Sequence, residues 1–127
     1  MREILFRGYS KEDNKWYYGS LVQTAKRYFI MSKVDGDLYS VKENSICEYT
    51  GFKDKNGNKI FEGDILQDNF SFSQVVIFNI DTGIWETYET NDKTDTLELY
   101  KYSKTTEVIG NIYETKLKGG KIKCGKQ

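Results

Sequence analysis

Residues 49–66 read Y-T-G-F-K-D-K-N-G-N-K-I-F-E-G-D-I-L, a polar segment enclosed between two apolar ones. The pair Asn56-Gly57 favours a two-residue type I′ turn, because both positions of that turn need positive φ. The aromatic and β-branched residues on either side favour half-buried strands. Residues 62–64, Glu-Gly-Asp, predict a second tight turn directly before another strand. The sequence therefore predicts four structural turn residues: Asn56, Gly57, Gly63 and Asp64.

Short apolar segments separated by turn signals extend from this stretch toward both ends of the chain. Residues 35–37, Asp-Gly-Asp, form a second strong hairpin signal. The high aromatic content (Tyr 10, Phe 7, Trp 2) favours strands over helices. Strands that recur about every ten residues predict an all-β barrel or sandwich of about nine to ten short strands with little helix. Short helical turns are compatible with residues 20–28 and 100–107, and the five expected strands of 61–113 are comparable with a small SH3-like barrel.

Length and charge divide the chain into a body and a tail. We expect one all-β domain over residues 1–114, or two subdomains over 1–50 and 61–114 that are joined by the turns of 49–66. All nineteen acidic residues and fourteen of the nineteen basic ones precede residue 115, so the body carries a net charge of −5. Residues 115–127 carry +5 and are predicted to be a flexible, Lys-rich tail.

The segment 49–66 resembles the signature of the YopX family of phage and prophage proteins. Two further segments are similar to that family in the same order, 1–7 (M-R-E-I-L-F-R) and 107–114 (E-V-I-G-N-I-Y-E). Residues 67–106 match in character only, and the tail departs from the family pattern. The resemblance implies an all-β fold and a mobile-element origin without an established activity, and it transfers no catalytic residue.

The composition excludes the commonest catalytic and metal chemistry. The chain has no histidine, the usual general base near neutral pH and the commonest metal ligand. Its two cysteines, Cys47 and Cys124, are too few for an ordinary zinc site. The start of the chain does not read as a signal peptide, and no apolar run is long enough for a membrane span, so we expect the protein in the cytoplasm of a bacterial host. We expect no catalytic, cofactor-binding or metal-binding residues and no enzymatic activity.

Carboxylates offer the remaining options for chemistry, and each has a simpler interpretation. A pair for glycoside hydrolysis would need one of Glu86, Glu89 or Glu98 opposite Asp64, but the chain holds many carboxylates and these are expected to be solvated charges. A cation site could be built from Asp35 and Asp37, or from Asp54, Asn56 and Asn58. The second set has the spacing of a calcium loop but lacks its glycine and its final glutamate, so it is interpreted as turn chemistry.

Surface recognition is the function class that the residues leave open. The tyrosines are too many for one small core, and the candidate recognition surface consists of Tyr17, Tyr18, Tyr88, Tyr100 and Tyr102. A structural alternative is cross-strand packing of these rings. We expect a protein-binding module with an unknown host or phage partner, and it could also form a homo-oligomer. The alternative is a single-stranded nucleic-acid-binding protein that uses surface tyrosines and the Lys-rich tail; the acidic body disfavours it, because such binding needs a positive groove.

Overall fold

The computed structural model describes residues 2–70 and 72–117, and these residues form an all-β fold. They contain eleven antiparallel strands in two sheets, one or two more strands than the sequence predicts. The described strands do not close into a barrel, so the barrel form of the prediction, including the SH3-like barrel, is not found. No helix within the described residues has the length and apolar character needed to cross a membrane.

Contacts between residues group the chain into two units, Met1–Tyr49 and Thr50–Gln127. The division falls inside one strand, β5 (Cys47–Lys53), which begins in the first unit and ends in the second. In the six-stranded sheet the order of strands is β4 (Leu38–Val41), β3 (Tyr28–Ser32), β2 (Lys15–Gln23), β1 (Phe6–Ser10), β5 and β6 (Lys59–Phe61). In the five-stranded sheet the order is β10 (Asp92–Glu98), β9 (Ile84–Glu89), β8 (Ser73–Asn79), β7 (Asp64–Gln67) and β11 (Glu107–Asn111).

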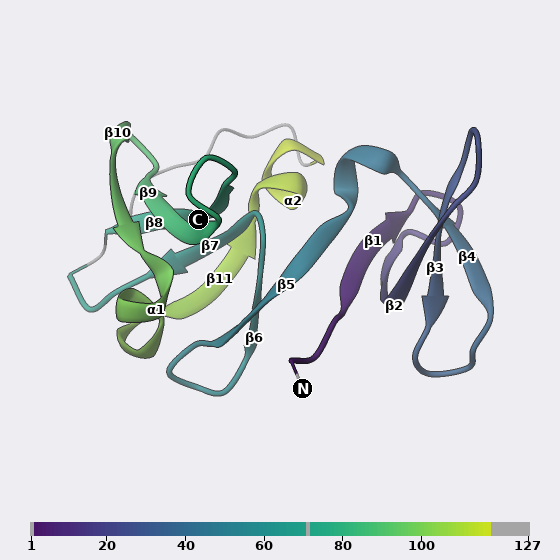
Figure 1. Cartoon of the computed structure of the whole chain (residues 1–127), viewed down its shortest axis with the longest axis horizontal. Coiled ribbons are helices and arrows are strands. Elements are labelled where there is room, and N and C mark those ends of the chain that lie inside the picture. Colours follow the sequence, from purple (N-terminus) through teal and green to yellow (C-terminus); the bar gives the residue numbers. More distant parts are fainter. Residues whose placement is uncertain (1, 71, 118–127) are drawn as a thin grey trace. The chain divides into compact units, whose positions relative to one another are not determined.

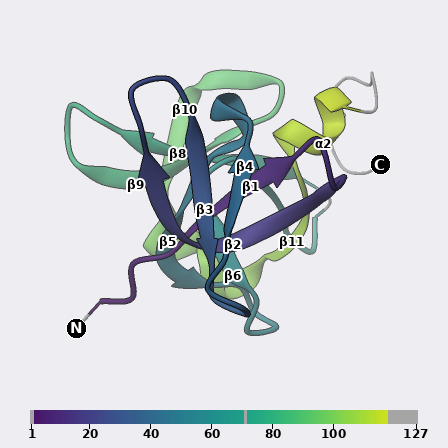
Figure 2. The ribbon, with the colours of Figure 1, turned by 90° about the vertical axis from the view of Figure 1, so that its right-hand side faces the viewer.

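The first unit is a meander of four strands followed by a 3₁₀ turn (Figures 1 and 2). Its elements are β1 (Phe6–Ser10), β2 (Lys15–Gln23), β3 (Tyr28–Ser32), β4 (Leu38–Val41) and η1 (Glu43–Ser45). Each strand pairs antiparallel with the next, and the start of β5 returns to pair with β1. Residues 20–28, where a helical turn was compatible with the sequence, belong instead to the β2–β3 hairpin.

Hydrogen bonds connect β1 to the residues that follow β4, although these strands are not neighbours in the sheet. The amide of Lys42 donates to the carbonyl of Tyr9 (3.0 Å), and the amide of Tyr9 donates to Oγ of Ser45 (2.8 Å). The approach is so close that a Cβ on Gly8 would lie 2.8 Å from a methyl carbon of Val41. Glycine at this position therefore permits the close approach of β4 to β1.

The second unit contains the remaining strands, two short α-helices and a 3₁₀ turn (Figure 1). Its elements after β5 are β6 (Lys59–Phe61), β7 (Asp64–Gln67), β8 (Ser73–Asn79), β9 (Ile84–Glu89), β10 (Asp92–Glu98), α1 (Leu99–Tyr102), η2 (Ser103–Thr105), β11 (Glu107–Asn111) and α2 (Ile112–Leu117). The core of this unit contains Ile60, Leu66, Val76 and Leu99, each fully buried. Phe52, Trp85, Tyr102 and Val108 pack against these four side chains.

Helical turns replace extended chain at two places in the second unit. Leu99 and Tyr102 lie three positions apart in α1, so one turn of helix directs both side chains toward the same core. The second place is α2, where Oδ1 of Asn111 accepts the amide of Glu114 (2.8 Å) in the manner of an N-cap. This helix includes residues 115–117, which the sequence assigned to a flexible tail. The rest of that predicted tail, 118–127, lies outside the described residues.

Candidate recognition pocket

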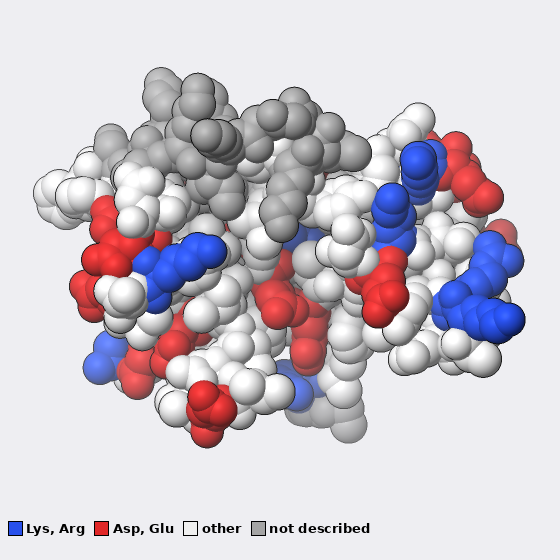
Figure 3. All heavy atoms as spheres, turned by 90° about the horizontal axis from the view of Figure 1, so that it is seen from above, with Lys and Arg blue, Asp and Glu red and all other residues white. Residues whose placement is uncertain are grey.

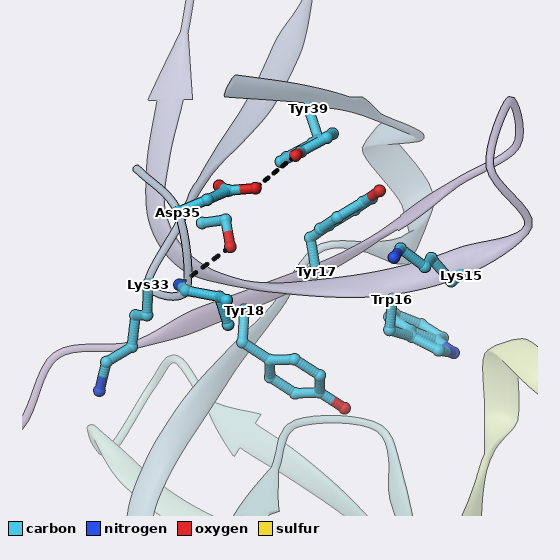
Figure 4. Close-up of a pocket in the computed structure, with 9 residues that line it drawn as sticks. Lys15, Trp16, Tyr17, Tyr18, Lys33, Asp35 and Tyr39 are labelled. Carbon is cyan, nitrogen blue, oxygen red and sulfur yellow. Dashed lines mark hydrogen bonds between the residues drawn. The ribbon is translucent and has the colours of Figure 1, made fainter. Parts of the chain in front are cut away.

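A pocket in the first unit lies between β2 and the turn that joins β3 to β4 (Figure 4). Its volume is about 250 Å³. Residues from three separate segments form its walls: Lys15, Trp16, Tyr17, Tyr18, Ser32, Lys33, Val34, Asp35 and Tyr39. Six of the ten tyrosines of the chain fall in residues 1–49, so this unit concentrates the aromatic hydroxyl groups.

The turn between β3 and β4 is built by local hydrogen bonds of Asp35 and Gly36. Oδ1 of Asp35 accepts the amide of Asp37 (2.9 Å), which is the pattern of an Asx turn. Gly36 takes a φ of +76° and donates its amide to the carbonyl of Ser32 (2.8 Å). The hairpin signal in residues 35–37 therefore corresponds to an observed turn, and this turn places the Asp35 carboxylate at the pocket.

The rings of Tyr17 and Tyr39 stack in parallel at the centre of the pocket. Their centroids are 3.9 Å apart and their planes differ by 5°. The hydroxyl of Tyr17 donates to Oδ2 of Asp13 (2.7 Å), and that of Tyr39 donates to Oδ2 of Asp35 (2.6 Å). Each ring is thus held at its hydroxyl end by a carboxylate and along its face by the other ring, which restricts its rotation before any ligand binds.

Both hydroxyls remain protonated far into the alkaline range. Partial burial and the carboxylate of Asp13 raise the pKa of Tyr17 to about 12. The hydrogen bond to Asp35, followed by partial burial, raises the pKa of Tyr39 to about 12. In the opposite direction, the bond from Tyr39 and the amide of Asp37 hold the pKa of Asp35 below its ordinary value. At neutral pH the pocket therefore presents neutral phenols and an ionised carboxylate.

Cations of the chain lie against the aromatic rings around the pocket. Nζ of Lys15 is 5.2 Å from the centre of the Tyr17 ring, and Figure 4 shows Lys15 and Tyr39 on different sides of that ring. The guanidinium carbon of Arg7 is 5.0 Å from the centre of the Trp16 ring. These distances are those of cation–π pairs.

The five tyrosines that the sequence analysis singled out are divided between the two units. Tyr17 and Tyr18 are neighbours on β2 and therefore point to opposite sides of the strand, as Figure 4 shows. Both line the pocket. Tyr88 lies on β9 of the second unit, while Tyr100 and Tyr102 belong to α1.

The three candidate tyrosines of the second unit have different surroundings. Nζ of Lys93 lies 5.7 Å from the centre of the Tyr88 ring, and the side chain of Tyr100 is exposed. Tyr102 packs against the core and donates its hydroxyl to Oδ2 of Asp68 (3.1 Å). Burial raises the pKa of Tyr102 above its ordinary value. Tyr102 therefore has a packing role that does not require a ligand.

The predicted recognition surface did not include four residues of the pocket and its surroundings: Trp16, Tyr39, Asp35 and Asp13. Tyr39 lies twenty-two positions after Tyr17, and no local pattern links the two. The sequence does contain a signal for Asp35. An aspartate before glycine favours a turn in which the carboxylate accepts nearby amides. The spacing of Asp35 from Tyr39, four residues across a hairpin turn, is the feature that would have pointed to their hydrogen bond.

The predicted central turn is present, but its type I′ geometry was wrong. Gly57 has a φ of +84°, whereas Asn56 is not among the residues with positive φ. The amide of Gly57 donates to the carbonyl of Asp54 (3.0 Å), and the amide of Asp54 donates to that of Asn58 (2.8 Å). This is a three-residue loop, in which glycine alone needs the left-handed conformation.

The carboxylate of Asp54 is the physical reason for that loop. Its Oδ1 accepts the amides of Asn56 (2.9 Å) and Asn58 (2.8 Å), and its Oδ2 accepts the amide of Val108 on β11 (3.0 Å). Burial disfavours the charged form, but these bonds outweigh it and keep the pKa of Asp54 below its ordinary value. The calcium-like spacing of Asp54, Asn56 and Asn58 thus corresponds to turn chemistry.

The second predicted turn joins β6 to β7. Gly63 has a φ of +84°, and Oδ2 of Asp64 accepts the amide of Phe61 (2.8 Å). Gly63 also donates its amide to Val76 (2.9 Å) and accepts the amide of Ile112 (2.9 Å) through its carbonyl. These bonds connect the turn to residues of the second unit that are distant from it in sequence.

Among residues 2–70 and 72–117, no group of three or more acidic, cysteine or histidine side chains is arranged to hold a metal ion. The pocket of the first unit offers one carboxylate, aromatic rings and two ammonium groups. That combination suits recognition of a polar or charged group more than coordination of a metal.

A family model described as YopX protein matches residues 5–117 of this sequence. The chain belongs to the YopX family. The match includes both units and also covers residues 67–106, where the sequence resemblance was one of character alone. No curated protein matches the sequence.

Proposed function

We propose that this YopX-family chain is a non-enzymatic protein-binding module, and that the pocket of the first unit is its contact surface. The observation that carries the proposal is the Tyr17–Tyr39 pair, fixed by two hydrogen bonds to carboxylates. Tyrosine gives a large contact area with few rotatable bonds, and a side chain that is already fixed loses little entropy when a partner binds. The mobile-element setting implied by the family suggests a partner from the host or the phage.

The distribution of charge supports a protein partner over a nucleic acid. Residues 1–49 hold eight basic and seven acidic side chains, so the pocket lies in a nearly neutral unit. Residues 50–114 hold six basic and twelve acidic side chains. On the face in Figure 3, the described basic side chains of each unit form small groups with acidic side chains nearby, and not a continuous positive area. Broad binding of a phosphate backbone would need such an area.

The test is affinity capture from host lysate, with and without nuclease treatment, using the full chain. We expect a protein partner that is retained after nuclease treatment and is lost with Tyr39→Ala. Tyr28→Ala is the matched control, because its hydroxyl also donates to a carboxylate, Glu43 (3.2 Å), outside the pocket. Circular dichroism checks that both variants fold. Equal capture by both variants would remove the pocket from the proposal.

Self-association is a second form of the same function, and it needs its own measurement. Light scattering during size-exclusion chromatography gives the mass of the particle over a range of concentrations. A mass that rises with concentration for the full chain but not for Tyr39→Ala would make a second copy the partner.

The nucleic-acid alternative depends on the lysines at the end of the sequence. Four of them follow Leu117, so a chain that ends at Leu117 removes most of that charge. If these four each neutralise a phosphate of a single strand, the slope of log K against log salt is about −2.8. Polarisation titrations with a labelled oligonucleotide measure this slope. A steep slope that disappears in the shortened chain would favour nucleic acid over a protein partner.

A further inference from the structure

The size of the pocket suits one amino-acid side chain better than a separate small molecule. Its volume is about 250 Å³, below the ~300–1,000 Å³ common for small-molecule sites. Its walls include three tyrosines, Trp16, the carboxylate of Asp35 and the ammonium groups of Lys15 and Lys33. A group that enters it meets flat aromatic surfaces, one negative charge and two positive charges.

The hydrogen-bonding groups around the pocket favour a donor as the ligand. The hydroxyl hydrogens of Tyr17 and Tyr39 are directed to carboxylates, and the Lys33 ammonium forms an ion pair with Glu3 (3.2 Å). These groups are therefore poorly placed to donate to an anion. A carboxylate has about four positions for accepting hydrogen bonds. The Asp35 side-chain bonds described above occupy one position on each oxygen, so it has capacity for a further donor.

The aromatic rings favour a donor that is also a cation. The faces of aromatic rings carry partial negative charge, so a cation on an open outer face of the stack is attracted to the ring that it covers. Lys15 already lies against Tyr17, which shows that the stack accommodates a positive group. Elsewhere in the same unit, the guanidinium of Arg27 lies 5.1 Å from the centre of the Phe29 ring. The aromatic faces of this unit are thus repeatedly paired with cationic side chains.

We infer that the pocket binds an arginine side chain presented by the protein partner. The guanidinium lies against the aromatic rings that line the pocket and donates to the Asp35 carboxylate. Arginine fits better than lysine because its planar group stacks on rings and offers several donors at once. This inference rests on the proposed protein-binding function and names the chemistry of the partner at this pocket.

The test uses small probes, so it needs no knowledge of the partner. N-acetyl-arginine methylamide is titrated into the full chain, and the NMR signals of the tyrosine rings and backbone amides are followed. N-acetyl-citrulline methylamide is the matched neutral probe, because it keeps the planar shape without the charge. The lysine derivative and inorganic phosphate test a point cation and an anion. We expect saturable shifts at Tyr17, Tyr39 and Asp35 with arginine, weaker shifts with lysine, and none with citrulline or phosphate.

Variants test which groups bind the probe. Asp35→Asn should weaken arginine binding about five- to tenfold, because it removes a charged acceptor. Asp37→Asn is the control, since it removes a charge from the same turn and leaves the Asp35 carboxylate in place. Lys15→Gln should strengthen arginine binding, because a positive charge that repels the guanidinium is gone from the pocket wall. Equal binding of citrulline and arginine, weaker binding by Lys15→Gln, or an unchanged affinity of Asp35→Asn would each overturn the inference.

Failure of the arginine pocket and failure of the proposed protein-binding function give different results. Capture of a partner that Tyr39→Ala abolishes and Asp35→Asn leaves unchanged would support the binding module and overturn the arginine pocket. Arginine-specific shifts at the pocket, without any captured protein, would support the pocket and count against the proposed function.

Discussion

The hydroxyl of Tyr39 donates a hydrogen bond of 2.6 Å to Oδ2 of Asp35 across the turn between β3 and β4. This bond is the main reason that the pKa of the Asp35 carboxyl lies below its ordinary value of 3.8. The same bond raises the pKa of Tyr39. Because one contact shifts the pKa values of both groups, it affects stability at both ends of the pH range.

In acid, we expect the stabilising effect of the Tyr39 hydroxyl to disappear. A carboxyl with a depressed pKa in the folded state contributes stability above its unfolded pKa and loses it as the pH falls through the folded value. Tyr39→Phe should therefore lower the free energy of unfolding at neutral pH and have a smaller effect well below pH 3.8. Urea denaturation of both proteins at the two pH values measures this. An equal difference at both would contradict the assigned hydrogen bond.

In alkali, Tyr17 and Tyr39 should ionise at a higher pH than an ordinary tyrosine does. A phenol with a raised pKa contributes stability that is complete below its ordinary pKa of 10.0 and is lost as the pH rises through about 12. Part of the ultraviolet absorbance of tyrosinate should therefore appear only at a pH near 12. This part should decrease in Asp35→Asn, because the charged acceptor is gone. Asp81→Asn, in the second unit, is the control. A titration that is identical in the two variants would count against the role of Asp35.

Asp54 should be among the most sensitive single positions of the second unit. The residue is 5% exposed, and its carboxylate accepts three backbone amides. Asp54→Ala should cost about 3 kcal/mol or more, because it removes bonds to a charged group and leaves donors unpaired. Asp54→Asn should cost less, because one oxygen remains as an acceptor. The control is Asp92→Ala, which removes a similar bond to the amide of Thr94 (3.0 Å) at the exposed start of β10 and should leave the free energy of unfolding near that of the parent.

The two turn glycines should resist β-branched replacements. Gly57 and Gly63 both have a φ of +84°. Gly57→Val and Gly63→Val should each cost about 1–3 kcal/mol, because valine is strained at positive φ. A Cβ at Gly57 would meet no atom within 4 Å, so the cost there comes from the backbone alone. Gly110→Val, at an equally open position without positive φ, is the control in thermal melts. Unchanged melting temperatures for both turn variants would contradict the strain.

Local chemistry explains which parts of the fold could be predicted from the sequence. Two signals act through the neighbouring backbone: glycines after aspartate or asparagine, and runs of β-branched and aromatic residues. The strands and turns could therefore be predicted. The type I′ assignment at Asn56 failed because a carboxylate two residues earlier, Asp54, accepts amides on both sides of the loop and the amide of Val108 on β11. That last bond spans fifty-four positions, a separation that no turn signal contains.

The sequence by itself determined the all-β class, the turn positions and the lack of histidine chemistry, since these follow from residue types and their neighbours. Only the tertiary structure decided which tyrosines share a site. Tyr17 and Tyr39 stack although β3 lies between their strands and the register aligns Tyr39, through Ile30, with Leu21 and not with Tyr17. Tyr18, the neighbour of Tyr17 in the chain, also lines the pocket but points to the other side of β2. Side chains alternate along a strand, and the folding of the sheet decides which of them meet, so proximity in space does not follow from position in the sequence.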